Sequence, residues 1–381
     1  AHPTAARPAV QTTLPSSILL FCLMLFSCSQ ARGAEAAAPQ ATVASVPSPT
    51  DRQIKAEAIE RFMRDRMAAF RVPGASLAVI EDGQVVYHRT FGMADNEKSV
   101  PVTASTLFEG ASLSKPLFAY FAMTFVEEGR LDLDRPLCEY LPHPDLTQDP
   151  RHRAITARMV LSHTSGLPNW RSGPGAEGLT IHFEPGSGFK YSGEGYQYLA
   201  LVLAHIAETD PAGLEDLFQA RVAKPLGMTR THFVRPPEES LIKATPYLDG
   251  KPLPQAPVKR EFGAAYSIET EAQDYARWMI ALLDARGLSE PAFATYFAGQ
   301  QAKIPEDEPE RAFGLQDWAL GLSVLETPIG RLYAHGGNNE GFTALMVLSR
   351  ERKWGMVLFT NADQVTMLGV ELMTFLQGAG G

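Results

Sequence analysis

Two stretches with the pattern of a β-hairpin lie at opposite ends of this chain, and together they constrain its fold more than any other feature. Residues 75–92 contain two β-rich runs around the turn pair Asp82-Gly83, which is a strong hairpin signal. Residues 341–363 contain two apolar runs around a charged turn. We therefore predict an α+β fold, in which an antiparallel sheet is built from both chain ends and covered by the first and last helices.

The middle of the chain has a different pattern. Residues from about 113 to 285 read mainly as helices interrupted by glycine and proline, so we expect a mainly helical lobe inserted into the sheet domain. The first helix is predicted in the run IKAEAIERFMRDRMAAF, behind a capping box of Thr50 and Gln53. A cleft between sheet and lobe is then the natural place for a site.

The N-terminal region has the composition of an export signal followed by a linker. Residues 14–28 are apolar but shorter than the about 20 residues of a membrane-spanning helix, which fits a secretory signal within residues 1–30. Cleavage near the run ARGAEAAA and cleavage before Cys28, in a lipoprotein signal, both remain open. We expect an exported protein that is periplasmic or tethered to the membrane by a lipid on Cys28. Residues 31–50 are expected to be a flexible linker before a single domain over 51–381.

Composition argues against several classes of partner. The 34 lysines and arginines are outnumbered by 43 acidic residues, and the net charge of −9 is spread without long runs of one sign. Nucleic acid and anionic membrane surfaces are therefore not expected as partners. The cysteines Cys22, Cys28 and Cys138 give neither a disulfide framework nor a zinc pattern. We expect no metal and no cofactor, and we expect Cys138 to be a buried packing residue.

Ser112 and Lys115 form the first candidate for chemistry. A spacing of three on a helix places both side chains on one face, and the run SKPLFAYFAMTFVEEGRL after Ser112 has a helical pattern. Ser112 would then lie at a helix N-terminus, where backbone N–H groups and the helix dipole favour a developing negative charge. An ordinary helix cap followed by a solvated lysine would have the same pattern.

The same spacing occurs twice more in the chain. Ser187 and Lys190 lie in a glycine-rich loop, and Ser240 and Lys243 precede a proline-rich stretch without a sustained helical pattern. Only Ser112 therefore has a suitable geometry for a nucleophile.

Tyr191 is the second candidate. It lies in a glycine-rich bend that runs directly into an apolar helix. Its pKa is ordinarily about 10, and neighbouring cations lower that pKa by stabilising the phenolate. Such a tyrosine can take the proton of Ser112 and pass it to a leaving group. The alternative is an ordinary packed aromatic side chain, which we expect for Tyr196 and Tyr198.

A third candidate is the run His335-Gly336-Gly337 at the end of a predicted strand. Two glycines beside an edge strand let a substrate backbone approach and pair with it. The N–H group of Asn338 could join that of Ser112 as an oxyanion hole. A turn with a surface histidine would explain this run equally well in isolation.

Taken in order, these runs resemble the serine β-lactamases and penicillin-binding-protein-like hydrolases. The resemblance is to the class C β-lactamase branch in particular, which is related to D-Ala-D-Ala carboxypeptidases and family VIII-type esterases. It extends from about residue 52 to residue 377. The similar runs are Ser112-x-x-Lys115, Tyr191-Ser-Gly193, His335-Gly-Gly337, VPGASLAVIEDG at 72–83, TLFEGASLSKP at 106–116, LSHTSGLP at 161–168 and KPLGMTRTHF at 224–233.

The resemblance implies a catalytic role for each of these residues. Ser112 would be the acylated nucleophile, activated by Lys115 together with Tyr191. The N–H groups of Ser112 and Asn338 would stabilise the tetrahedral oxyanion. His163, in the run LSHTSGLP, is expected to support the fold rather than to act as a base, and the family needs no metal.

Two positions depart from the family pattern. Gly193 stands where these enzymes commonly have asparagine, which removes a side-chain amide that would hold the substrate's acylamide. His335, which with Gly336 would line the edge strand, replaces the lysine of the Lys-Thr-Gly motif. A permanent cation thereby becomes a group with an ordinary pKa of about 6.5. We expect weak recognition of a substrate carboxylate near neutral pH, and stronger recognition as His335 gains a proton.

The reaction expected is hydrolysis through a covalent acyl-enzyme. The first substrate class is a β-lactam or D-alanyl-peptide amide derived from peptidoglycan, because the resemblance spans the chain and export suits cell-wall substrates. A carboxylesterase of the same fold is the alternative, favoured by both departures. A penicillin-binding or cell-wall interaction protein without turnover is the second alternative.

Overall fold

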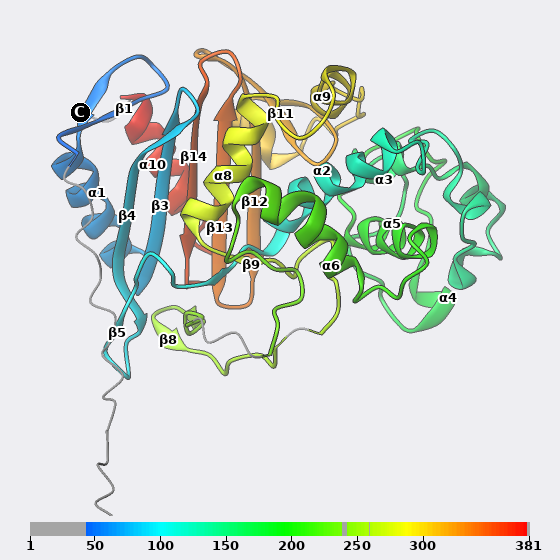
Figure 1. Ribbon diagram of the computed structural model, residues 1–381, viewed down its shortest axis with the longest axis horizontal. Coiled ribbons are helices and arrows are strands. Elements are labelled where there is room, and N and C mark those ends of the chain that lie inside the picture. Colours follow the sequence, from blue (N-terminus) through cyan, green and yellow to red (C-terminus); the bar gives the residue numbers. More distant parts are fainter. Residues whose placement is uncertain (1–42, 238–241, 259, 379–381) are drawn as a thin grey trace, which may run out of the picture. The chain divides into compact units, whose positions relative to one another are not determined.

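The computed structural model describes residues 43–237, 242–258 and 260–378. An eight-stranded antiparallel sheet forms its centre, in the order β10-β11-β12-β13-β14-β3-β4-β5 (Figure 1). The α+β prediction is confirmed, because β14 from the C-terminal end pairs with β3 from the N-terminal end. The strands are β3 (Gly74–Glu81), β4 (Gln84–Asp95), β5 (Val100–Pro101), β10 (Leu315–Trp318), β11 (Ser323–Thr327), β12 (Gly330–Asn339), β13 (Phe342–Ser349) and β14 (Trp354–Thr360).

Both predicted hairpins are present. Strands β3 and β4 pair from Glu81 and Gln84 outward, with a shift of register between Val79 and Ile80. The two turn residues, Asp82 and Gly83, both have positive φ angles of 46° and 74°, which is the conformation that a two-residue hairpin turn needs. Strands β13 and β14 form the second hairpin.

Helices cover both faces of the sheet. The helices α1 (Ala56–Ala69) and α10 (Thr366–Gln377) pack on one face, where their apolar side chains share a cluster with strand residues such as Leu77 and Leu358. The helix α8 (Ala272–Leu283) covers the other face (Figure 1). The prediction had included α8 in the helical lobe. It instead belongs to the sheet domain, because its apolar side packs on the sheet.

The helical lobe lies beside the sheet (Figure 1). Its first helix, α2 (Ser114–Glu127), is buried over most of its surface, which explains why apolar residues occur all around it. Apart from α8, the other α-helices between α2 and β10 are α3 (Ala157–Leu161), α4 (Gly175–Gly178), α5 (Gly193–Ile206), α6 (Leu214–Phe218), α7 (Lys224–Leu226) and α9 (Glu290–Phe297).

The folded chain begins earlier than the predicted linker allows. Residues 45–47 form β1 (Ser45–Pro47), which pairs with β2 (Gln53–Lys55). Val46 is fully buried, and the indole N–H of Trp354 donates to the carbonyl of Pro47 at 3.1 Å. The capping-box prediction is wrong because Gln53 lies in β2. The helix α1 starts at Ala56 without a side-chain cap.

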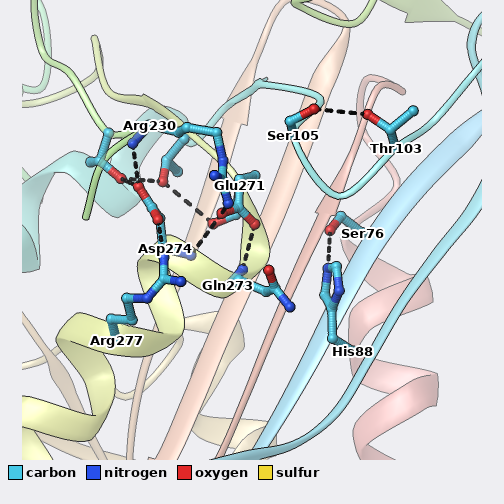
Figure 2. A network of polar contacts seen from close by, with 11 residues as sticks. Ser76, His88, Thr103, Ser105, Arg230, Glu271, Gln273, Asp274 and Arg277 are labelled. Atoms are coloured by element: carbon cyan, nitrogen blue, oxygen red, sulfur yellow. Dashed lines mark hydrogen bonds and ion pairs between the residues drawn. The ribbon is translucent and has the colours of Figure 1, made fainter. Parts of the chain in front are cut away.

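A buried network of charged side chains holds the start of α8 (Figure 2). The carboxylate of Glu271 accepts from the backbone N–H groups of Gln273 at 2.6 Å and Asp274 at 3.0 Å. Arg230 donates to Glu271 at 2.7 Å, and Asp274 also pairs with Arg277. Burial and the neighbouring Asp274 raise the pKa of Glu271 to about 7. The network fixes the chain just after β9 (Glu269–Thr270), which pairs with β6 (Phe108–Glu109).

Several predictions concern residues at the margins of this fold. The predicted export signal, with Cys22 and Cys28, lies outside the described residues. Cys138 is half-buried with a free thiol. In the part of the chain that the structure describes, no helix combines the length and apolarity that a membrane crossing requires. A further short hairpin consists of β7 (Tyr247–Leu248) and β8 (Lys251–Pro252).

Candidate active site

Ser112 lies in a tight turn directly before α2. The turn is a 3₁₀ segment over Ala111–Leu113, and Ala111 has a positive φ of 48°. The hydroxyl of Ser114 fastens the turn by donating to the Ala111 carbonyl at 2.6 Å and by accepting from the N–H of Ile268 at 3.0 Å. Gly110 donates to the Ile268 carbonyl at 2.9 Å. The β6–β9 segment therefore holds the serine from both sides.

Lys115 points its ammonium group at Ser112, as the spacing predicts. Its Nζ lies 3.1 Å from the Ser112 Oγ and donates to the carbonyl of Ala265 at 2.9 Å. The side chain is 1% exposed. Burial lowers the pKa of Lys115 to about 7, because an ammonium without water loses hydration. A large fraction of this lysine is therefore neutral near pH 7.

Tyr191 lies against both of these residues. The Lys115 Nζ is 4.6 Å from the centroid of the Tyr191 ring, and Tyr191 and Ser112 interact through a side-chain hydrogen bond. Burial nevertheless raises the pKa of Tyr191 above its ordinary value, and the bond to Ser112 offsets this only in part. The expectation that cations lower this pKa is wrong, because the loss of water around the phenolate dominates. Lys115, and not Tyr191, has the pKa of a base.

His163 packs against Tyr191. Its ring lies 4.3 Å from the Tyr191 ring, between centroids, and its Nδ1 accepts from the N–H of Ser192 at 3.0 Å. The Lys190 N–H donates to the His163 carbonyl at 2.8 Å. Burial lowers the pKa of His163 well below its ordinary value. A neutral, fully buried histidine that holds the Tyr191 bend fits the predicted supporting role.

His335 differs from its predicted behaviour. The side chain is 4% exposed, and burial, with Lys115 nearby, lowers its pKa to about 3. Its Nδ1 donates to the carbonyl of Gly336 at 2.6 Å, which leaves a lone pair on Nε2. That Nε2 is buried and has no hydrogen-bond partner among the described residues. The expected gain of a proton near pH 6.5 is wrong, and His335 is a buried, neutral side chain instead of a cation.

The edge of β12 faces Ser112. Strand β11 pairs with β12 only as far as Ala334, and no described strand pairs with residues 335–339 on that side. A Cβ atom on Gly337 would lie 2.5 Å from the Gly110 carbonyl oxygen and 3.2 Å from the Ser112 nitrogen. Glycine is therefore required for this close approach.

Asn338 follows at the same edge. Asn339 and Phe342 close a two-residue hairpin, so the alternation of an antiparallel ladder directs the N–H groups of Gly336 and Asn338 away from β13. The amide side chain of Asn338 donates to Asp363 at 2.7 Å, on the other side of the strand. The backbone N–H of Asn338 thus faces the open edge near Ser112.

Gly193 leaves no space for the asparagine of the family pattern. A Cβ atom there would lie 2.8 Å from the Asn169 carbonyl oxygen and 2.9 Å from the indole of Trp170. The Gly193 N–H donates to the same carbonyl at 3.1 Å. Trp170 is 49% exposed, and its ring lies 5.7 Å from the ring of Tyr266. The two oxygens of Asn169 and the indole of Trp170 therefore crowd the position where the family pattern has asparagine.

The other occurrences of the serine–lysine spacing do not resemble this arrangement. Ser187 is exposed in a loop, and Ser240 lies outside the described residues. Lys243 is nearly buried and pairs with Glu109 at 2.6 Å and Glu269 at 3.1 Å. Of the copies whose serine the structure describes, only Ser112 has the lysine of its spacing at hydrogen-bond distance.

Three parts of the site have no signal in the sequence. The Ala265 carbonyl that binds Lys115 lies in the run FGAAYS, which matches no catalytic motif. Trp318, whose ring lies 4.9 Å from that of His163, and the contact of Trp170 with Tyr266 join residues from distant segments. Only a pattern that links such segments could have revealed them. Tyr196 and Tyr198 are buried core residues, as expected.

Comparison with known proteins agrees with this geometry. The family model Beta-lactamase matches residues 59–373. Protein flp of Staphylococcus aureus (strain N315) is 23% identical over 80% of this chain and 63% of its own length. Esterase EstB of Burkholderia gladioli is 33% identical over 54% of this chain and 59% of its own length. The chain thus spans less than two thirds of the length of either relative.

A solved structure shares the fold of this chain. The crystal structure of D-alanine carboxypeptidase AmpC from Burkholderia cenocepacia matches with a TM-score of 0.70 and 20% identity, over 85% of this chain and 98% of that one. Because the family model covers nearly all of the described residues, the chain belongs to the β-lactamase family of hydrolases.

Proposed function

We propose that this chain is a serine ester hydrolase that works through a covalent acyl-enzyme. The observation that carries the proposal is the 3.1 Å contact between the Ser112 hydroxyl and a buried Lys115 with a pKa of about 7. A neutral lysine at this distance can accept the serine proton as the hydroxyl attacks.

Acylation begins when the Ser112 oxygen bonds to the ester carbonyl carbon and its proton moves to the Lys115 nitrogen. The carbonyl oxygen becomes an oxyanion. Tyr191, which is protonated because burial raises its pKa, donates its proton to the leaving alcohol oxygen as the carbon–oxygen bond breaks. The tyrosine then regains a proton from Lys115, which returns to the neutral form.

Deacylation repeats these steps with water. Water bonds to the acyl carbon and gives a proton to Lys115. The bond to Ser112 breaks, and the serine oxygen regains a proton through Tyr191. The sum is ester plus water giving acid plus alcohol. The N–H groups of Ser112 and Asn338 are the proposed donors to the oxyanion in both halves, and each such donor is typically worth about 10²- to 10³-fold in rate.

Two features favour an ester over the β-lactam or D-alanyl-peptide amide that ranked first in the sequence. The oxygens of Asn169 and the indole of Trp170 crowd Gly193, so the chain has no asparagine side chain at this position to bind an acylamide. His335 is neutral and its Nε2 atom is buried, so it offers no positive charge to a substrate carboxylate. The match to Esterase EstB supports the same choice.

Amide substrates remain the second candidate. The unpaired edge at Gly336 and Gly337 suits a peptide backbone, which can add to it as a further strand. A third outcome is a protein that is acylated by penicillin and does not turn over.

One set of measurements distinguishes these outcomes. Purified protein is assayed with p-nitrophenyl butyrate, with nitrocefin and with an N-acylated D-alanyl-D-alanine peptide, and a fluorescent penicillin adduct is sought by mass spectrometry. We expect ester turnover to dominate. Ser112→Ala should lower it by at least about 10³-fold, whereas Ser187→Ala, the matched variant in the exposed copy of the spacing, should not change it. Amide turnover that exceeds ester turnover would overturn the proposal, as would an active Ser112→Ala variant.

We also propose, from the sequence, that the protein is exported and that Cys28 is lipidated. Expression of the sequence with a start codon, followed by fractionation and mass analysis of the mature N-terminus, tests this. Cys28→Ser should release a lipid-tethered form into the soluble exported fraction. A protein that is found in the cytoplasm and still carries residues 1–30 would contradict export.

A further inference from the structure

Lys243 belongs to a serine–lysine spacing that the proposed catalysis does not use, and it lies almost buried between two carboxylates. Its Nζ atom is 2.6 Å from Glu109 and 3.1 Å from Glu269, and 9% of its side chain is exposed. Burial by itself would lower the pKa of Lys243, but the two carboxylates raise this pKa above its ordinary value. A buried ion pair of this kind adds little net stability, because its charges lose hydration, but it gives the Glu109 carboxylate a fixed direction.

The other oxygen of Glu109 faces the end of β12. The side-chain amide of Asn339 donates to the Glu109 Oε2 at 2.6 Å and to the Tyr266 carbonyl at 3.2 Å. Glu109 is 5% exposed, so water competes little for this bond. The carboxylate therefore joins two segments that are 230 residues apart in the chain: Lys243 binds one of its oxygens and Asn339 binds the other.

This bond lies next to both proposed oxyanion donors. Glu109 ends β6 and comes three residues before Ser112. Asn339 ends β12 and directly follows Asn338. The segment that carries one donor is thus attached, through a single hydrogen bond between side chains, to the segment that carries the other.

The same two segments also touch at Gly337, where an added Cβ atom would lie 2.5 Å from the Gly110 carbonyl oxygen. This contact limits how closely β12 approaches the turn that carries Ser112. A single contact still allows β12 to slide or to rotate about it. The bond from Asn339 to Glu109 is a second point of attachment, so it fixes the direction of β12 as well as its distance.

We propose that the hydrogen bond between Glu109 and Asn339 positions the two oxyanion donors described above. This proposal rests on the proposed acyl-enzyme chemistry and adds two positioning residues to it, which act through the donors and not through contact with the substrate. The donors accelerate the reaction only while both lie within hydrogen-bond distance of the same oxygen. Supporting bonds outside a site are what hold such groups within about 0.5 Å of the productive geometry.

The test compares p-nitrophenyl butyrate with its thionoester, in which sulfur replaces the carbonyl oxygen. Sulfur is larger than oxygen and a weaker hydrogen-bond acceptor, so the thionoester gains little from oxyanion donors. The readout is the ratio of kcat/KM for the ester to that for the thionoester. A variant that only loses folded protein lowers both rate constants equally and leaves this ratio unchanged.

Asn339→Ala should lower the ratio by about tenfold, which is less than the loss expected when a whole donor is removed. Glu109→Gln should lower the ratio as well, because a single amide oxygen replaces two acceptors that face in different directions. The double variant should lose less than the product of the two effects, because both changes break the same bond. If Asn339→Ala does not fold, Glu109→Gln alone decides the outcome.

Gln219→Ala is the matched control. It removes another bond between a side-chain amide and a buried carboxylate, that of Gln219 to Glu215 at 2.8 Å in the helical lobe, so the ratio should not change. Urea unfolding of each variant checks that it folds. If the wild-type protein hydrolyses the ester and the folded variants at 109 and 339 keep the wild-type ratio, the positioning role is wrong while ester hydrolysis stands. If the wild-type protein does not hydrolyse p-nitrophenyl butyrate, the proposed function itself fails.

Discussion

The Nζ atom of Lys115 lies 3.1 Å from the Oγ atom of Ser112, and none of the ion pairs among the described residues includes this lysine. A carboxylate beside Lys115 would stabilise its charged form and raise its pKa. Its other hydrogen bond goes to a neutral carbonyl, that of Ala265, so burial dominates and the pKa falls to about 7.

The rate of ester hydrolysis should therefore rise with pH. Below pH 7 Lys115 is protonated and cannot accept the serine proton, and above pH 7 it is neutral and can. We expect kcat/KM for a neutral ester to increase tenfold per pH unit below a midpoint near 7 and to level off above it. A pH–rate profile measures the midpoint. His335→Gln should leave that midpoint in place because the pKa of His335 is about 3, and a midpoint that disappears in this variant would assign the base to histidine.

Tyr191→Phe should affect poor leaving groups more than good ones. An alkyl alcohol needs a proton as it departs, whereas p-nitrophenolate does not, so the loss should be about 10²- to 10⁴-fold for an ethyl ester and much smaller for the p-nitrophenyl ester. Tyr198→Phe, which removes a buried hydroxyl bonded to the Leu141 carbonyl, should lower stability without changing the ratio of the two rates. Equal losses for both esters in Tyr191→Phe would exclude the proposed proton donation.

Alanine substitutions at the two adjacent glycines of β12, Gly336 and Gly337, should have very different effects. An alanine at 337 would place Cβ 2.5 Å from the Gly110 oxygen, which forces the strand away from the Ser112 N–H. We expect kcat to fall by about 10²-fold. An alanine at 336 meets nothing within 4 Å, so the free energy of unfolding should change by less than about 0.5 kcal/mol. Urea unfolding and kinetics of both variants test this pair, and a fully active Gly337→Ala would show that the strand tolerates the shift.

Restoring the family's asparagine at 193 should not restore amide chemistry. Its Cβ would collide with the Asn169 carbonyl oxygen at 2.8 Å and with Trp170 at 2.9 Å, and such overpacking costs about 1–3 kcal/mol. We expect Gly193→Asn to be less stable and to gain no nitrocefin turnover. Adding Trp170→Ala relieves only the indole contact, so stability should recover in part. Nitrocefin turnover by the single variant would mean that the bend can move.

Glu271 makes folding stability depend on pH. Burial raises its pKa to about 7, above the value of about 4.5 in an unfolded chain. The folded state therefore holds this proton more tightly, and the contribution of Glu271 to stability is greatest below pH 4.5 and is lost as pH rises through 7. We expect the free energy of unfolding, relative to Glu271→Gln, to decrease from pH 4.5 to pH 8. A difference that stays constant over this range would show that Arg230 already fixes the charge.

The sequence predicted those parts of the molecule that follow from local patterns. The Asp82-Gly83 turn and the helix after Ser112 are determined by neighbouring residues, so the predictions of this hairpin and this helix were confirmed. The start of the fold was not, because β1 gains its burial from Trp354 at the other end of the chain. The helix α8 was assigned to the wrong layer for the same reason: its periodicity shows that one side is apolar, not which surface covers that side.

The predictions for the site divide in the same way, into those that follow from local spacing and those that depend on distant segments. The spacing of Ser112 and Lys115, and their order with Tyr191 and Gly337, indicated which residues meet. The pKa values of Tyr191 and His335 were mispredicted, because they depend on how completely the surrounding chain excludes water. Trp170 was missed because its importance comes from a contact with a residue far away in the sequence.

The turn that carries Ser112 also bears on how stable this protein can become. Ala111 adopts a left-handed backbone, with φ 48°, which costs a residue with a side chain about 1–2 kcal/mol and costs glycine almost nothing. Glycine would relieve that strain and at the same time allow the turn other conformations. Ser112, the proposed nucleophile, is thus held in place by a residue that makes the whole protein less stable than its sequence could be. Selection for thermostability alone would therefore act against the geometry of the proposed site.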